Sequence, residues 1–185
     1  MPGTLERKIL VHVRNTDATD WIDGIKRWAP GIEAVQLVDD KLPDGLDPAS
    51  IDISVCWRMP HGLHAQLPNL KLIQSMAAGV DHILTDPKRP TEVAIARLVD
   101  PWMARSMTHH VVSQILRWHR TLDRFDACKV EESWPTNVIF DPDAVSIGIL
   151  GMGVLGQAAA RALTTLGFPV RGWSRSPKSV EGIEV

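Results

Sequence analysis

The stretch Ile147-Gly-Ile-Leu-Gly-Met-Gly-Val-Leu-Gly156 decides the fold of this chain, because it joins an apolar run to a glycine-rich turn. We expect a strand over Ala144–Leu150 and an alanine-rich helix over Gln157–Leu166, so that strand, turn and helix follow one another directly. In this order, a GxGxxG turn binds the phosphates of a dinucleotide at a helix N-terminus. A tight strand-to-helix turn without a ligand is the alternative interpretation.

Each glycine of this turn has a stated physical role in such a site. Gly151 makes the tight turn, Gly153 lets the backbone approach a pyrophosphate, and Gly156 lets the helix pack closely on the strand. The free N–H groups and partial positive charge of the helix N-terminus then attract the phosphates. The turn residues that we predict to bind the cofactor are Gly151, Met152, Gly153, Val154, Leu155 and Gly156.

A second strand, predicted over Phe168–Trp173, ends where the adenosine ribose of a dinucleotide would lie. Ser174 follows it, 18 positions after Gly156, where an NAD-binding protein carries an acid. A serine there does not repel a 2′-phosphate, and Arg175 and Lys178 can add charge-assisted hydrogen bonds to that phosphate. We therefore predict NADPH in preference to NADH, bound by Trp173, Ser174, Arg175 and Lys178. The alternative is that the two cations are solvated surface residues.

The first part of the chain alternates short β-branched runs with helical patterns or turn-rich links. That rhythm is typical of a parallel sheet wrapped by helices, and we expect residues 1–100 to form one doubly wound α/β domain. Between the strands, a helix is expected over Asp17–Trp28 and a loop over Asp40–Pro48. The predicted strands are Lys8–Val13, Ala34–Val38, Ile53–Trp57, Leu70–Gln74 and Val93–Arg97.

Residues 101–185 follow a different pattern, which predicts an interdomain helix and then an incomplete nucleotide-binding domain. A single long helix is expected over about Trp102–Phe125, from the helical spacing of Val111, Ile115, Trp118 and Leu122. A polar, proline-containing stretch, Lys129–Pro142, separates this helix from the strand-turn-helix-strand unit. Val185 falls where a third strand of the second sheet should begin.

Composition and charge exclude several classes of function. A net charge of −2 over 185 residues gives no reason to expect nucleic acid or an anionic membrane as a partner. The N-terminus has no secretory signal pattern and no apolar run is long enough to span a bilayer, so we expect a cytoplasmic protein. Cys56 and Cys128 lack disulfide or zinc-ligand spacing, so we predict buried free thiols and no metal site.

Three blocks of sequence resemble the D-isomer-specific 2-hydroxyacid dehydrogenase family, and within it the glyoxylate/hydroxypyruvate reductase A branch. They are Ser75–Leu84 (SMAAGVDHIL), Val112–Trp118 (VSQILRW), and Ile147–Gly156 continuing to Gly167–Arg175 (GFPVRGWSR). The resemblance covers essentially the whole chain. It implies a flavodoxin-like doubly wound substrate domain, followed by the first βαβ half of a Rossmann nucleotide-binding domain. It also implies NADPH-dependent reduction of a small 2-oxo acid, such as glyoxylate or hydroxypyruvate, and a homodimer formed through the long helix.

The same resemblance places the substrate on the first domain. Ala78, Gly79 and Val80 would hold the substrate carboxylate with backbone amides, which agrees with the anion affinity of successive N–H groups at a glycine turn. Read alone, this segment could be only a strand-to-helix turn. Trp57 would line the substrate pocket at the carboxyl edge of the sheet. We infer Arg58 as a second carboxylate contact, with a surface salt bridge as an equal alternative.

The sequence departs from the family pattern in two places. Thr108-His109-His110 stands where the long helix usually begins with an acid followed by tyrosine or histidine. We interpret these two histidines as surface or interface residues, and His61, His64 and His82 as polar surface residues. The family's catalytic arginine, carboxylate and histidine would all lie downstream of Val185, so no catalytic residue is predicted here. We therefore expect a fragment of a longer enzyme, and the alternative is a non-catalytic nucleotide-binding or dimerising remnant.

Overall fold

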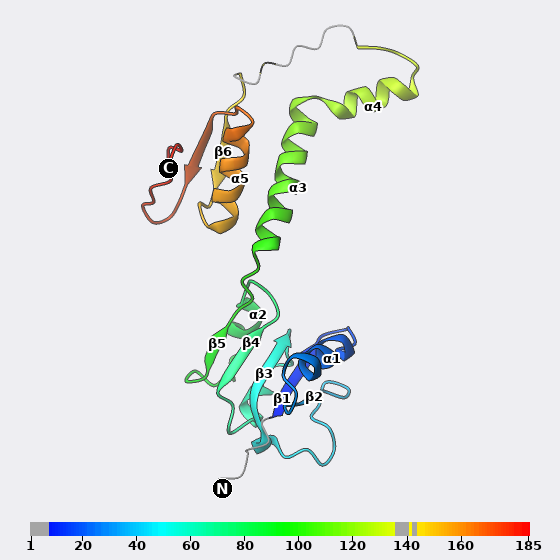
Figure 1. Cartoon of the computed structure of the whole chain (residues 1–185), viewed down its shortest axis with the longest axis vertical. Helices are drawn as coiled ribbons and strands as arrows, with labels where there is room; N and C mark the ends of the chain where they lie inside the picture. The colour runs from blue at the N-terminus through cyan, green and yellow to red at the C-terminus, as the bar shows by residue number, and fades with distance from the viewer. Residues whose placement is uncertain (1–7, 136–140, 142–143) are drawn as a thin grey trace. The chain divides into compact units, whose positions relative to one another are not determined.

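A computed structural model of the chain describes residues 8–135, 141 and 144–185 (Figure 1). The chain divides into two compact units, Met1–Val99 and Asp100–Val185. Each unit contains a parallel sheet of its own, so the architecture is α/β in both. Among the described residues, no helix is long and apolar enough to cross a membrane.

The first unit is built on a five-stranded parallel sheet in the order β2-β1-β3-β4-β5. This is the strand order of flavodoxin-like sheets. The chain adds β2 on one side of β1 and then adds β3, β4 and β5 on the other side, so the strand order reverses between the parallel neighbours β1 and β3. All five strands predicted for this unit are present, with ends displaced by at most two residues. Their bounds are β1 Lys8–Val13, β2 Glu33–Gln36, β3 Ile51–Trp57, β4 Leu72–Ser75 and β5 Ala94–Ala96.

Both faces of this sheet carry apolar clusters, as a doubly wound fold requires. Ile9 and Val11 of β1 pack in a cluster with residues of helix α1 (Thr19–Trp28) on one face. Leu10 lies between them in the sequence and packs with Ile73 of β4 in a second cluster. This alternation follows from the period of two in a strand, which sends successive side chains to opposite faces.

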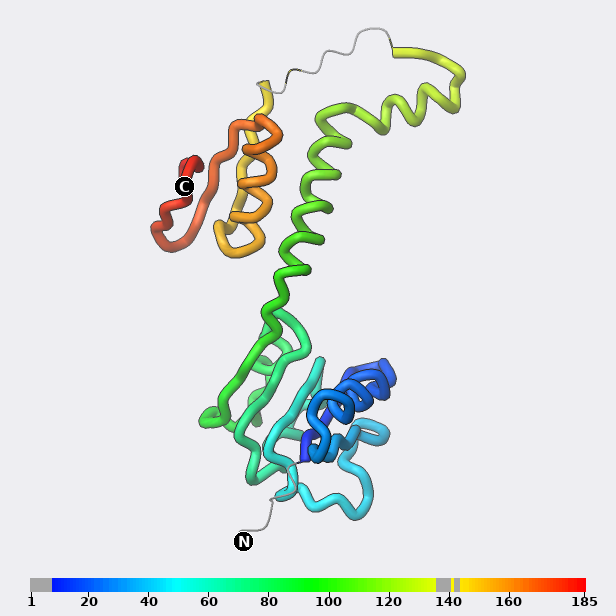
Figure 2. Tube along the Cα trace, in the orientation of Figure 1, coloured from blue at the N-terminus to red at the C-terminus, as the bar shows by residue number. Residues whose placement is uncertain are grey.

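The second unit begins with two helices, α3 (Pro101–His119) and α4 (Leu122–Val130). The prediction of one continuous helix over Trp102–Phe125 is wrong, because Thr121 interrupts it with a left-handed backbone of φ 47°. Figure 2 shows the chain turning at this point. Apolar spacing continues through the break, so the periodicity alone does not reveal it.

A parallel strand pair follows, with one helix between its strands: β6 Ile147–Leu150, α5 Val154–Thr165 and β7 Val170–Trp173. Both strands start later than predicted, and α5 starts earlier, directly after Gly153. Glu184 forms a parallel bridge with Arg171 of β7, and the N–H of Gly172 donates to its carbonyl oxygen at 2.7 Å. One parallel bridge therefore lies beside β7 near Val185, and the third strand itself stays a prediction.

The predicted polar stretch Lys129–Pro142 lies partly outside the described residues, and its first two residues end α4.

Cys56 and Cys128 are free thiols, as predicted. Burial raises the pKa of the Cys56 thiol to about 11, so it is protonated at neutral pH. Cys128 is only half-buried, and it lies on α4, which has no buried residue. The prediction of burial is therefore wrong for this thiol. Within the described part of the chain, no three potential metal ligands cluster together.

Candidate functional site

The glycine-rich turn between β6 and α5 has the geometry that its sequence predicts. Gly151 adopts φ +110°, a conformation that other residues rarely adopt, so the tight turn needs a glycine. A Cβ added at Gly156 would lie 2.0 Å from the carbonyl oxygen of Gly151, because helix and strand approach each other so closely. A Cβ added at Gly153 would meet no atom within 4 Å, so the space beside this residue is open to a ligand.

A cavity of about 460 Å³ lies beside this turn in the second unit. It brings the turn together with the segment that follows β7. Its lining residues are Gly151, Met152, Gly153, Trp173, Ser174, Arg175, Ser176 and Lys178, and none of them carries a carboxylate. The predicted residues Val154, Leu155 and Gly156 do not line the cavity, because they form the first turn of α5.

Lys178 spans this cavity toward the turn. Its Nζ donates a hydrogen bond to the carbonyl oxygen of Met152 at 3.0 Å. The Nε2 of Gln157, which was not predicted as a site residue, donates to the same oxygen at 3.0 Å. An ammonium has three donors, so Lys178 retains donors for a bound phosphate. Arg175 forms no ion pair with any residue that the structure describes.

Sequence reasoning missed the contact that seats the turn on β7. The side chain of Met152 is 1% exposed, and a Cβ added at Gly172 would lie 2.7 Å from its Cγ and Sδ. Gly172 therefore leaves room for the Met152 side chain beneath the turn. The available signal was a glycine inside a predicted strand, since such glycines often mark close packing.

Comparison with known proteins gives the relatives of this chain. Residues 112–185 match the family described as D-isomer specific 2-hydroxyacid dehydrogenase, NAD binding domain. The chain is 35% identical over 175 residues to glyoxylate/hydroxypyruvate reductase A of Serratia proteamaculans, and 36% identical over 181 residues to that of Escherichia fergusonii. The chain is a relative of the D-isomer-specific 2-hydroxyacid dehydrogenases. The alignments cover 91% and 95% of it but 53% and 56% of these relatives, so it spans about half their length.

Solved structures of 2-hydroxyacid dehydrogenases share its fold. The D-isomer specific 2-hydroxyacid dehydrogenase from Xanthobacter autotrophicus, in complex with NADPH and MES, matches with a TM-score of 0.84 at 33% identity. The NADPH-dependent glyoxylate/hydroxypyruvate reductase from Sinorhizobium meliloti, in complex with NADP and sulfate, matches with a TM-score of 0.81 at 34% identity. Each match covers 96% of this chain, and 56% and 55% of the two structures.

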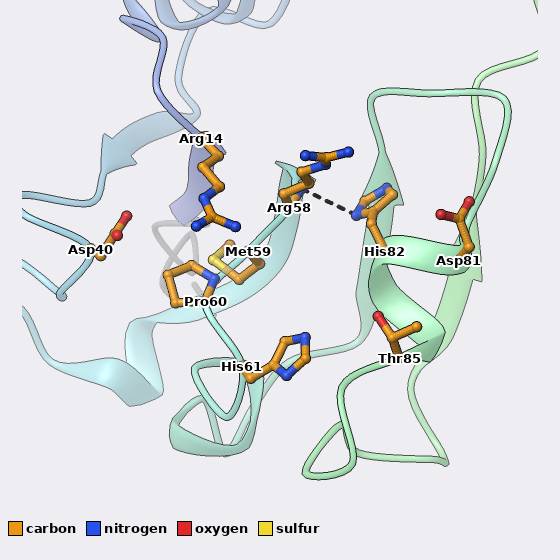
Figure 3. A pocket seen from close by; sticks show the side chains of 9 residues that line it. All are labelled: Arg14, Asp40, Arg58, Met59, Pro60, His61, Asp81, His82 and Thr85. Carbon is orange, nitrogen blue, oxygen red and sulfur yellow. Dashed lines mark hydrogen bonds between the residues drawn. The ribbon is translucent and has the colours of Figure 1, made fainter.

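In the first unit of this dehydrogenase relative, a second cavity of about 520 Å³ lies at the carboxyl edge of the sheet (Figure 3). Arg14 follows β1 and Arg58 follows β3, the two strands where the sheet order reverses, and ligands of α/β sheets bind at such points. Arg58 has a backbone φ of 55° and lies over the ring of Trp57, 5.4 Å from its centroid. The lining residues are Arg14, Asp40, Arg58, Met59, Pro60, His61, Asp81, His82 and Thr85.

The predicted substrate loop, Ala78, Gly79 and Val80, lies between β4 and the short helix α2 (Asp81–Leu84). The loop and Trp57 are outside the lining of this cavity, whereas the first residues of α2 belong to it. Within the described residues, the N–H groups of the three loop residues have no hydrogen-bond acceptor. Successive unpaired N–H groups of this kind are what a bound anion requires.

One histidine that was predicted as a surface residue, His64, is buried inside the first unit, so that prediction is wrong for it. His64 is 2% exposed, and its Nε2 is 3.0 Å from the Oγ of Ser54. Burial lowers the pKa of His64 to about 4, so its ring is neutral at physiological pH. His82 is half-buried, with its ring centroid 4.6 Å from that of Trp57. The other three predicted surface histidines, His61, His109 and His110, are exposed.

Proposed function

We propose that this chain contributes the NADPH site and the substrate-carboxylate site to the reduction of a small 2-oxo acid to its 2-hydroxy acid. The substrate class is that of glyoxylate and hydroxypyruvate, which the relatives carry in their names. The observation that carries the proposal is the cavity beside the glycine-rich turn, which combines an anion-binding turn with two cations and no carboxylate. Bound NADPH would supply the hydride for this reduction.

The charges in this cavity support NADPH over NADH. An NAD site places a carboxylate on the ribose 2′-hydroxyl, and here Ser174, which lines the cavity, would occupy that position. Arg175 offers a planar fork of donors to a 2′-phosphate, and Lys178 offers a point charge. The relatives from Xanthobacter autotrophicus and Sinorhizobium meliloti are described with NADPH and NADP.

The pyrophosphate of the cofactor would be held where the turn meets α5. Gly153 precedes the first residue of this 12-residue helix, and no side chain fills the space beside it. The N–H groups of the first helical turn have no partner within the helix and point toward its N-terminus. Val154 and Leu155 would therefore act through their backbone amides rather than through their exposed side chains.

The substrate side of the proposal rests on the first unit. The unpaired N–H groups of Ala78, Gly79 and Val80 would bind the carboxylate of the 2-oxo acid. Arg58 forms no ion pair with a described residue, which leaves its guanidinium available for a carboxylate. Trp57 contacts both Arg58 and His82, and would limit the size of the substrate.

Tryptophan fluorescence tests the cofactor assignment, because Trp173 lines the proposed nucleotide cavity. We expect saturable quenching by NADPH, with a dissociation constant at least about tenfold lower than for NADH, a difference of about 1.4 kcal/mol. A Trp173→Phe variant controls for signal from the other tryptophans. Equal affinities for the two cofactors would contradict the 2′-phosphate assignment, and the absence of binding would contradict the cofactor site itself.

A second assay separates the proposed function from a non-catalytic nucleotide-binding role. NADPH oxidation by the chain is followed with and without glyoxylate or hydroxypyruvate. Oxidation that depends on the 2-oxo acid would support catalysis by this chain. Saturable NADPH binding without any such turnover would favour the non-catalytic alternative.

We also propose that α3 mediates self-association into a homodimer. None of its residues is buried, and its exposed apolar side chains include Trp102, Met103, Met107 and Trp118. Analytical ultracentrifugation should detect a dimer that is weakened by Trp118→Gln. The matched control is Trp28→Gln on α1, where the side chain is 84% exposed in the other unit. A monomeric wild-type chain would contradict this proposal.

A further inference from the structure

His82 connects the two segments that carry the proposed substrate site, through hydrogen bonds at both ring nitrogens. The backbone N–H of Arg58 donates to Nδ1 of His82 at 3.2 Å, the dashed line in Figure 3. Nε2 of the same ring lies 2.9 Å from the Oγ of Ser75. Ser75 ends β4 and is fully buried, so its hydroxyl has a fixed position from which to act on the loop that follows.

The hydroxyl of Ser75 completes this network. The N–H of Ala77 donates to its Oγ at 3.1 Å, and the hydroxyl donates to the carbonyl oxygen of Gly79 at 2.9 Å. A backbone N–H can only donate, so Nδ1 of His82 is the unprotonated nitrogen and Nε2 carries the proton. In this tautomer each donor has one acceptor: Nε2–H donates to Ser75, and the proton of Ser75 goes to Gly79.

We propose that His82 is a positioning residue for the substrate: through Ser75 it holds the turn Ala77–Gly79, and through Nδ1 it holds the peptide of Arg58. This inference rests on the proposed function, in which the overlapping segment Ala78–Val80 and Arg58 receive the substrate carboxylate. The arrangement requires a neutral ring, because a protonated Nδ1 cannot accept the hydrogen bond from Arg58.

The surroundings of His82 favour the neutral ring. Burial lowers its pKa, Asp81 opposes this effect, and Arg58 adds to it. Other charged or titratable side chains lie nearby: His64 interacts electrostatically with His82, and Arg14, Asp40 and His61 line the same cavity. At neutral pH the network is therefore intact, and it is lost when the ring gains its second proton.

Nitrogen NMR spectra of the full chain test the network directly. At pH 7.5 we expect the His82 ring to show one protonated nitrogen, Nε2, and one unprotonated nitrogen, Nδ1. On acidification, the amide signals of Arg58, Ala77 and Gly79 should move together with the His82 titration. These movements should vanish in His82→Gln and persist in His61→Gln, which changes a histidine of the same cavity. Averaged tautomers, or amides that do not follow His82, would overturn the proposal.

Oxamate, an unreactive analogue of a small 2-oxo acid, separates positioning from the proposed function. In the wild-type chain, oxamate should shift the amide signals of Ala78, Gly79 and Val80 saturably. Its affinity should fall at least about fivefold in His82→Phe and in Ser75→Ala, and stay unchanged in His110→Gln, which changes an exposed histidine outside this cavity. Equal affinities in the wild-type chain and a folded His82→Phe variant would overturn the positioning role alone. No oxamate shift in the wild-type chain would overturn the proposed substrate site, and this inference with it.

Discussion

Gly156 approaches Gly151 so closely that an added Cβ would lie 2.0 Å from the carbonyl oxygen of Gly151. We therefore expect Gly156→Ala to lower the free energy of unfolding of the second unit by about 2 kcal/mol or more. Overpacking costs about 1–3 kcal/mol, and a clash with backbone is at the upper end of that range. The better helix propensity of alanine offsets only about 1 kcal/mol of it.

Chemical denaturation followed by circular dichroism measures this effect. Gly148→Ala is the matched control, because a Cβ at Gly148 in β6 would meet no atom within 4 Å. We expect the control to change the free energy of unfolding by less than about 1 kcal/mol. Similar losses in the two variants would contradict a specific contact between Gly156 and Gly151.

Gly153→Ala should separate cofactor binding from stability. A Cβ at this position meets nothing in the chain itself, so we expect little change in the free energy of unfolding. The same Cβ would occupy the space where the pyrophosphate should approach the backbone, so NADPH affinity should fall more than about tenfold. Fluorescence titration and thermal melting of the same samples check both expectations. A variant that binds NADPH as the wild type does would exclude the pyrophosphate from this turn.

Ser174→Asp should reverse the cofactor preference. A carboxylate at this position would repel a 2′-phosphate and accept hydrogen bonds from a ribose 2′-hydroxyl. We expect the NADPH dissociation constant to rise at least about tenfold, and the NADH constant to stay equal or fall. Ser179→Asp adds the same charge to an exposed position outside the cavity lining, so it should leave the ratio unchanged. Parallel titrations with the two cofactors measure that ratio.

The parts of the fold that follow from local patterns were predictable from the sequence. The strands of the first unit and the glycine-rich turn were found because apolar runs and glycines mark them residue by residue. The break between α3 and α4 was not found, because Thr121 adopts a left-handed backbone that its residue type does not predict. The ion pairs of Arg117 with Asp123 and Asp126 span this corner, and they form only once the chain has turned.

The residues of the candidate sites were likewise predictable only where a local sequence pattern marks them. Ser174, Arg175 and Lys178 could be predicted because they follow one strand and lie near one another in the sequence. His64 was mistaken for a surface residue and the contacts of His82 were missed, because their partners lie 10 and 24 positions away, in Ser54 and Arg58. A single histidine in the sequence gives no sign of such a partner. Tertiary contacts decide its burial, and the sequence pattern does not encode them locally.

The buried ring of His64 should make the first unit sensitive to mild acid. Burial holds its pKa at about 4 in the folded chain, whereas an exposed histidine titrates near 6.5. The unfolded state therefore takes up a proton first as the pH falls below about 6.5. The stability that the neutral ring contributes is present above that pH and is lost progressively toward pH 4, by an amount on the order of 3 kcal/mol.

His64→Gln tests this prediction, because glutamine can still bond to Ser54 but does not titrate. We expect the free energy of unfolding of the wild-type chain to fall between pH 7 and pH 4.5 more steeply than that of the variant. His12 and His82 also have pKa values lowered by burial, and both remain in the variant, so the difference between the two slopes isolates His64. Urea denaturation at several pH values measures the slopes. Identical slopes would mean that the pKa of His64 is the same in the folded and unfolded chains, and would contradict the effect of burial on this ring.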